Sequence, residues 1–147
     1  MTADSLFRLC NSTALAGWLL LVAVSYTHLS QFPSVTMIDW KNGKPNARYW
    51  VLSLLKDNFH AGDKLVETTV SSHSGIAAQG FVTPTGKKLL LINKRKRVID
   101  VTLPDGAQNA NLSMVDEASG EGAARSSKQE GTHLDLAPFG VVVVSFP

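Results

Sequence analysis

The stretch that decides the fold is Ile76-Ala-Ala-Gln-Gly-Phe-Val-Thr-Pro-Thr-Gly-Lys-Lys-Leu-Leu-Leu-Ile-Asn93. Two runs of apolar and β-branched residues, 76–83 and 88–93, flank the turn signal Pro84-Thr-Gly86. Strands joined by a tight turn have this pattern. Because no helical spacing of three and four residues interrupts the runs, we expect two neighbouring antiparallel strands here.

The rest of the chain after Asp63 repeats this pattern. Turn signals separate its runs, and no helical period lies between them. The stretch Asp116–Gly131, rich in Glu, Ser, Gly and Ala, is interpreted as a mobile loop. Residues 63–147 therefore predict a mainly β domain, an antiparallel β-sandwich of about seven strands. The five further strands are expected at Leu65–Val70, Val98–Leu103, Ala110–Asp116, Thr132–Leu136 and Gly140–Phe146.

Residues 31–62 predict one strand followed by one helix. The strand is Ser34-Val-Thr-Met-Ile-Asp-Trp40. From Ala47, with Asn46 as the cap, apolar residues recur at intervals of three and four until Gly62 stops the helix. A strand of such apolar character suits a parallel sheet with neighbours on both sides, so this segment is interpreted as the last βα unit of a larger α/β domain. The apolar helix positions are Trp50, Val51, Leu54, Leu55 and Phe59.

Residues 1–30 form an apolar leader, expected to be helical around the run Ala14–Val24. A helix of that run would span ~17 Å, short of the ~30 Å hydrocarbon core of a bilayer, so we expect no stable membrane span. Two interpretations stay open. A secretory signal, with Arg8 before the apolar run, would imply a secreted or periplasmic protein. Alternatively, Ala23–Leu29 resembles translated sequencing-adapter DNA, which would make the leader chimeric.

Beyond the leader, the sequence resembles a known enzyme family. Gln31–Leu52 looks like the last strand and helix of the (β/α)8 barrel of a family 39 glycoside hydrolase, and Leu55–Leu65 is similar to the joint between that barrel and its C-terminal sandwich. Lys87–Arg95 and Leu136–Val144 resemble sandwich strands of the same group. The resemblance implies a bacterial-type parent that hydrolyses glycosidic bonds without a cofactor, using two carboxylates on earlier barrel strands. No residue of this chain occupies either position, so the resemblance implies an inactive C-terminal fragment.

Asp39 and Trp40 are the candidate substrate-binding residues. Asp39 ends the parallel-type strand, where α/β barrels place their chemistry, and Trp40 would offer an aromatic face to a sugar ring in the intact parent. The alternative is that Asp39 caps the following turn and Trp40 packs under the barrel rim. No catalytic residue and no metal site are predicted, because the four histidines lack ligand spacing and Cys10 is the only cysteine.

The strongest charged feature is Lys94-Arg-Lys-Arg97. It is interpreted as a solvated hairpin loop, with an anionic-polysaccharide or nucleic-acid patch as the alternative. No aromatic residue interleaves it, as stacking on bases would need, and the formal net charge is only +2. We therefore expect no nucleic-acid partner.

These features predict a non-catalytic accessory sandwich of a glycoside hydrolase, meeting carbohydrate through the barrel of its parent. The alternative is an exported carbohydrate-binding or basic interaction module. Independent carbohydrate binding is disfavoured because no Trp or Tyr follows Trp50. Parent substrate and oligomeric state are not predicted.

Overall fold

The structure, a computed structural model, describes residues 36–71 and 75–147. The described residues belong to two compact units, 36–43 and 44–147. The predicted apolar helix of residues 1–30 lies outside the described residues, and so does the beginning of the predicted strand 34–40.

Residues 36–40, the described part of that predicted strand, do not form a strand. Local contacts bend the backbone instead. The Thr36 hydroxyl donates to the Ile38 carbonyl at 2.7 Å, and the Gly43 N–H donates to the Asp39 carbonyl at 2.8 Å. Hydrogen bonds within a bend replace the ladder that a strand would need from a neighbour.

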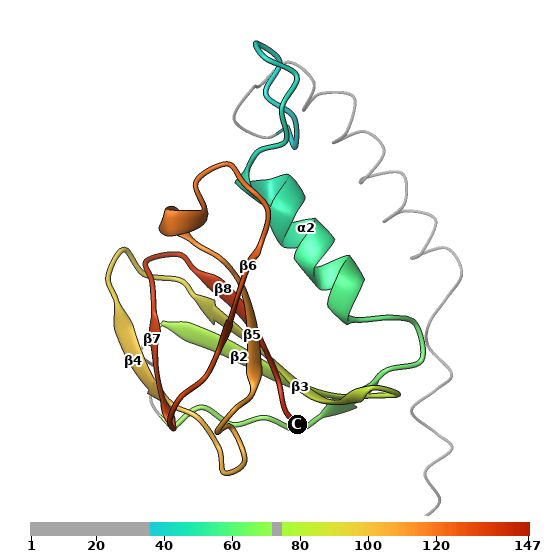
Figure 1. Ribbon diagram of the computed structural model, residues 1–147, viewed down its shortest axis with the longest axis vertical. Coiled ribbons are helices and arrows are strands. Elements are labelled where there is room, and N and C mark those ends of the chain that lie inside the picture. Colours follow the sequence, from blue (N-terminus) through green and yellow to red (C-terminus); the bar gives the residue numbers. More distant parts are fainter. Residues whose placement is uncertain (1–35, 72–74) are drawn as a thin grey trace, which may run out of the picture. The chain divides into compact units, whose positions relative to one another are not determined.

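In the unit 44–147, helix α2 (Ala47–Asn58) precedes eight strands (Figure 1). Asn46 caps the helix as expected, and its side-chain oxygen accepts from the N–H groups of Arg48 and Tyr49. A short 3-10 helix, η3 (Glu117–Ser119), lies between two strands. The strands are β1 (Lys64–Val66), β2 (Ile76–Thr83), β3 (Gly86–Asn93), β4 (Ile99–Thr102), β5 (Asn111–Val115), β6 (Arg125–Lys128), β7 (His133–Leu136) and β8 (Val141–Ser145).

The strands form a six-stranded sheet in the order β1-β2-β3-β8-β5-β6 and a two-stranded sheet of β4 and β7, and every pair is antiparallel. The antiparallel β-sandwich is therefore confirmed. Its central strand β8 is buried throughout Val141–Val144. Side chains alternate along a strand, so continuous burial requires a cover on each face of the sheet.

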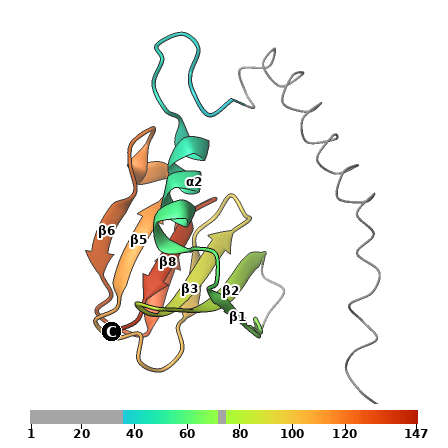
Figure 2. The ribbon, with the colours of Figure 1, turned by 90° about the vertical axis from the view of Figure 1, so that its right-hand side faces the viewer.

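Helix α2 covers one face. Its buried residue Leu54, 3% exposed, packs in a cluster with Val115, Val141 and Val143. Figure 2 shows α2 running along the sheet beside β5 and β8. The helix that was predicted to be a barrel element thus packs in the sandwich core.

Both ends of α2 are tied to strands or loops that lie far away in sequence. Near its beginning, the Trp50 indole Nε1 donates to the Glu121 carbonyl at 2.8 Å. At its end, Lys88 Nζ donates to the Asn58 carbonyl at 3.1 Å, a favourable position for a cation beside the last helical carbonyls. The ring of Phe59 stacks on that of Phe81 of β2, with centroids 4.2 Å apart.

The two-stranded sheet covers the opposite face. Leu134 and Leu136 of β7 point inward and pack with Leu89, Leu91 and the inward residues Val142 and Val144 of β8. This second cluster is the larger of the two and forms the interior of the sandwich. Among the described residues, no helix is long and apolar enough to cross a membrane.

Strand β1 is shorter than predicted. It ends at Val66 rather than Val70, and the Thr68 hydroxyl then accepts the hydrogen bond from the Gly80 N–H at 2.8 Å. A side chain thereby replaces a backbone carbonyl as the partner of β2, and the strand stops.

The prediction of a loop over Asp116–Gly131 was wrong, because this stretch contains η3 and β6. Strand β6 is the edge of the six-stranded sheet and pairs only with β5. All four of its side chains are exposed, so the apolar alternation that marks a half-buried strand is missing from Arg125-Ser-Ser-Lys128. The predicted count of about seven strands becomes eight in the described residues.

Candidate functional site

The sequence-predicted residues Asp39 and Trp40 lie in the unit 36–43. The Asp39 carboxylate accepts a hydrogen bond from the Lys41 N–H at 2.9 Å, within the turn that follows it. Trp40 is 66% exposed. Their predicted contact with substrate in an intact parent stays a prediction.

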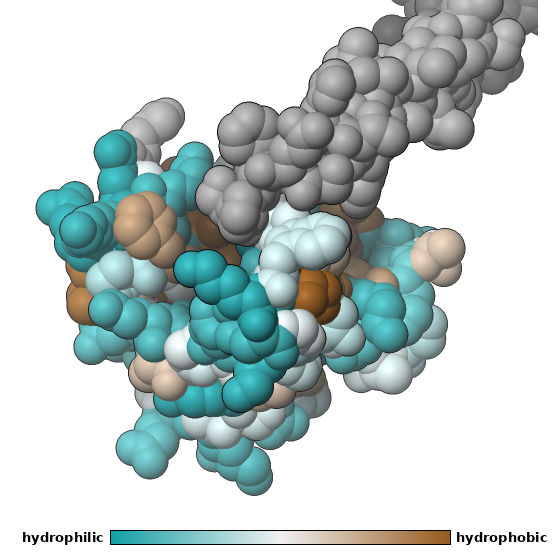
Figure 3. Space-filling view, turned by 90° about the horizontal axis from the view of Figure 1, so that it is seen from above, coloured by the Kyte–Doolittle hydropathy of each residue, from teal (hydrophilic) through white to brown (hydrophobic). Residues whose placement is uncertain are grey.

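Helix α2 also carries apolar side chains on the side that faces away from the sheet. Tyr49 and Leu52 are 39% and 47% exposed, while Leu54 is buried under the helix. Figure 3, a view from above, shows mainly hydrophilic residues outside the grey atoms, with hydrophobic ones scattered among them. Because Tyr49 and Leu52 are large apolar residues exposed on the same helix, they form a candidate contact surface.

A second candidate surface joins two loops at one end of the sandwich. The basic loop, residues 94–98, connects β3 to β4, and the Phe139 loop, residues 137–140, connects β7 to β8. The Phe139 N–H donates to the Arg95 carbonyl at 3.1 Å, which places an aromatic residue beside the four consecutive cations. Phe139 is 61% exposed, and Val98 is 58% exposed.

One buried side chain holds the two loops together. Asn93, 1% exposed, donates through its amide nitrogen to the carbonyls of Arg97, Leu136 and Ala137 at 2.7, 3.2 and 2.9 Å. Its amide oxygen accepts from the Arg95 N–H at 2.8 Å. Every polar atom of this buried amide is used, so the relative position of the loops is fixed.

The charge of the basic loop is not neutralised within the described residues. None of the ion pairs there includes Lys94, Arg95, Lys96 or Arg97. Four cations exceed the net charge of +2 of the whole chain, so the remainder of the protein is net negative. The basic loop is therefore a concentrated positive surface.

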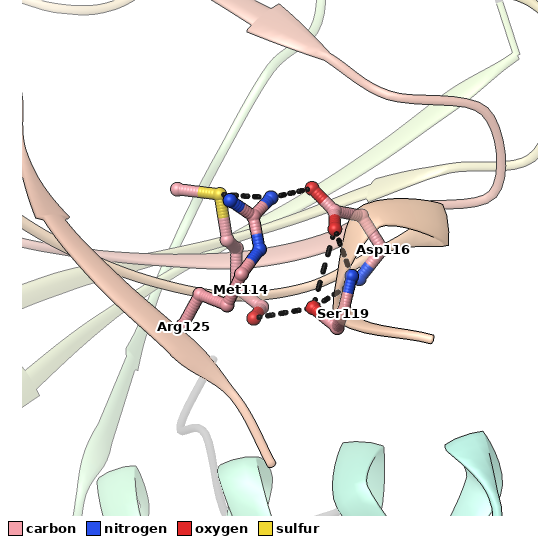
Figure 4. A network of polar contacts seen from close by, with 4 residues as sticks. All are labelled: Met114, Asp116, Ser119 and Arg125. Atoms are coloured by element: carbon pink, nitrogen blue, oxygen red, sulfur yellow. Dashed lines mark hydrogen bonds and ion pairs between the residues drawn. The ribbon is translucent and has the colours of Figure 1, made fainter. Parts of the chain in front are cut away.

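An acidic residue beside the Phe139 loop, Asp116, is already paired. Asp116 Cβ lies 3.6 Å from the position that a Cβ on Gly140 would occupy. Its carboxylate meets Arg125 Nη2 at 2.6 Å and also accepts from the Ser119 N–H, as Figure 4 shows. The Asp116 side chain is 8% exposed, so its role is to hold η3 and β6 together.

Sequence reasoning missed this second surface. The basic loop was recognised, but no aromatic residue lies near it in sequence. Phe139, far along the chain, is the aromatic residue that lies beside it in the structure. The signal was the turn Pro138-Phe-Gly140, where a large apolar residue stands between turn formers.

Several grooves open on the sandwich. One, of about 510 Å³, has an apolar floor that includes Ile76 and Leu91, and Glu67 and Asp100 are among its lining residues. Asp100 lies on the exposed face of β4, where its carboxylate is 3.3 Å from His133 Nδ1. Another groove, of about 770 Å³, is lined by residues of β1, β2 and β3, among them Phe81 and Leu89, and by the turn 104–106 and Phe146. No cluster of three potential metal ligands occurs in residues 36–71 and 75–147.

Comparison with protein families gives one match. Residues 73–144 match the sequence model of the family described as D-apionate lactonase, C-terminal immunoglobulin-like domain. No curated protein matches the chain.

Solved structures support the same sandwich. A family 30 endoxylanase from Clostridium papyrosolvens matches with a TM-score of 0.55 and 15% identity, over 75% of this chain and 30% of that one. A family 30 subfamily 8 xylanase from Clostridium acetobutylicum matches with a TM-score of 0.56 and 11% identity, over 74% and 30%.

A third solved structure, a conserved exported protein from Bacteroides fragilis, matches with a TM-score of 0.55 and 14% identity, over 65% of this chain and 21% of that one. The chain thus spans less than a third of the length of each of these proteins. At such low identity the likeness concerns the fold.

Proposed function

We propose that this chain is a non-catalytic accessory sandwich of a glycoside hydrolase, which packs against the catalytic barrel of its parent and stabilises it. The observation that carries the proposal is the match of the sandwich to a small part of much longer sugar-cleaving enzymes. The family match to a C-terminal immunoglobulin-like domain supports the same position in the parent. Membership of family 39, from the sequence resemblance, remains a prediction, because the solved glycoside hydrolases matched are of family 30.

Helix α2 is the proposed contact with the barrel. Leu54 on one side of the helix packs on the sandwich, whereas Tyr49 and Leu52 are exposed on another side. A helix with apolar residues on more than one face is expected to be covered on each of them. In the proposed parent, α2 is the last barrel helix and is shared by the two domains.

The first experiment is to resequence the source DNA across the codons for Ala23–Leu29. The proposal expects a reading frame that encodes a (β/α)8 barrel and continues into Gln31. The joined protein is then compared with its Tyr49→Glu/Leu52→Glu variant. Because charges at a buried interface are unfavourable, the variant should lower the melting temperature of the barrel; an unchanged melting temperature would count against the shared helix.

The second experiment tests whether the chain is inactive alone. The purified chain is incubated with xylan and with chromogenic glycosides, beside its Glu67→Gln and Asp100→Asn variants. Both residues are among those that line one groove, so they are the acids chosen for the test. We expect no product above the blank for any of the three proteins. Turnover by the wild type that is lost in either variant would overturn the non-catalytic proposal.

A further inference from the structure

The side chain of Phe139 is exposed although its backbone is unfavourable for such a residue. Its φ is +52°, in the left-handed region, where a Cβ crowds the following carbonyl. Fixed contacts hold the backbone there: the Phe139 N–H donates to Arg95, and the Gly140 N–H donates to Ala137 at 3.0 Å. Residues held in such conformations concentrate at ligand-binding positions. An apolar ring that gains little burial in return points to a function of the ring itself.

The backbone that carries the cations is fixed. Two hydrogen bonds of the buried Asn93 amide hold it, one to the Arg97 carbonyl and one from the Arg95 N–H, and two more join it to the carbonyls of Leu136 and Ala137. The Lys94 N–H donates to the Gly75 carbonyl at 2.8 Å, and the side chain of Arg95 lies against Gly75, where any added Cβ would clash with it. A surface that is ordered before binding loses less entropy when a ligand arrives.

We propose that the basic loop and Phe139 together bind an anionic polysaccharide, with carboxylates of uronic acid units meeting the cations and one sugar ring stacking on the phenyl ring. Lys and Arg pair with carboxylates, and the face of an aromatic ring accommodates the apolar face of a sugar while the polar groups stay in water. The choice of a polysaccharide rests on the proposed function, because the matched solved enzymes are xylanases.

Nucleic acid is the less favoured ligand for this surface. Proteins that bind single strands line a groove with several aromatic residues on which successive bases stack. Here one ring stands beside the cations, at the end of the sandwich and outside both of the grooves described above. A single stacking position with flanking charges fits one sugar unit and its charged neighbours.

The test is equilibrium binding of the full chain to polygalacturonate, measured by calorimetry and by retardation in affinity electrophoresis. The matched ligand control is fully methyl-esterified polygalacturonate, which keeps the sugar backbone and loses the charge. We expect binding to the acid form, none to the ester, and at least tenfold weaker binding when salt is raised to about 0.5 M, because exposed charges are screened. Single-stranded DNA is the third ligand.

Two variants separate the contributions of charge and ring. Lys94→Gln/Lys96→Gln should weaken binding about tenfold, since two exposed ion pairs are lost. Lys64→Gln/Lys128→Gln, on the edge strands β1 and β6, removes the same charge elsewhere and should leave binding within about twofold. Phe139→Gly should weaken binding about tenfold while its melting temperature stays the same or rises, because glycine relieves the left-handed backbone.

Three outcomes would overturn the proposal: equal binding to acid and ester, equal losses in the two lysine pairs, or Phe139→Gly binding like wild type. Tighter binding to single-stranded DNA than to polygalacturonate, with the same dependence on Phe139, would reassign the surface to nucleic acid. None of these readouts involves hydrolysis or a barrel. Failure here is therefore distinguishable from failure of the proposed function, which is decided by turnover and by the upstream reading frame.

Discussion

Replacing Leu54 by alanine tests whether α2 belongs to the sandwich core. Leu54 is 3% exposed and packs on Val115, Val141 and Val143 of the six-stranded sheet. Buried Leu→Ala changes cost about 2–5 kcal/mol, depending on how far the site collapses. Because a helix lying on a sheet can shift inward to fill part of the space, we expect a loss of about 2–3 kcal/mol in the free energy of unfolding.

The matched control is Leu52→Ala, the same change two positions earlier on the same helix. Leu52 is 47% exposed, so its loss should cost less than about 0.5 kcal/mol. Both variants carry the same small change in helix propensity, and that term cancels when they are compared.

The assay is urea unfolding followed by circular dichroism, with the helical and sheet signals fitted separately. If α2 is part of one cooperative unit, both signals share one transition, and Leu54→Ala moves its midpoint without changing the slope m. Equal costs for Leu52→Ala and Leu54→Ala, or a helical signal that melts before the sheet, would refute the assignment of α2 to the core.

Three further variants test the contacts that position the loops and the helix. Asn93→Ala should cost about 2–4 kcal/mol, because it leaves buried carbonyls without a donor, and thermal unfolding should show it as a large fall in melting temperature. Asp116→Ala should cost about 1–2 kcal/mol through loss of the η3 cap and the partly exposed Arg125 pair, with no added effect of Arg125→Ala in the double variant. Lys88→Met should cost about 1 kcal/mol by removing the donor to the Asn58 carbonyl, and a urea titration that finds no change would show that this contact is not stabilising.

The strands with apolar side chains were predictable from sequence. In β2, β3 and β8 the residue types and the turn signals agree with the fold, because these strands are partly or fully buried and are therefore rich in apolar residues. Strand β6 was not predictable in this way. Its residues are all exposed, and only pairing with β5, a contact made in space, makes them a strand.

The position of α2 shows a different limit. Its boundaries and its Asn46 cap follow from local patterns, but the surface on which it packs does not. The four valines of β8 did carry the signal, since a strand apolar on successive residues needs a cover on both faces. The turn Pro138-Phe-Gly140 marks Phe139 as unusual, but its partner could not be predicted, because the contact with Arg95 is a hydrogen bond between loops more than forty residues apart.

The place of β8 in the sheet has a consequence for how the protein is made. Among the described strands it comes last in sequence, yet it lies between β3 and β5. The hairpin of β2 and β3 and the hairpin of β5 and β6 can each pair internally as they emerge from the ribosome, but they have no shared edge until Val141–Ser145 has been translated. Domains usually fold as units during synthesis. Here the β2–β3 hairpin and the β5–β6 hairpin each keep an unpaired inner edge until β8 is made. Closure by a distant strand is slow, so this interval is when a chaperone would be most needed.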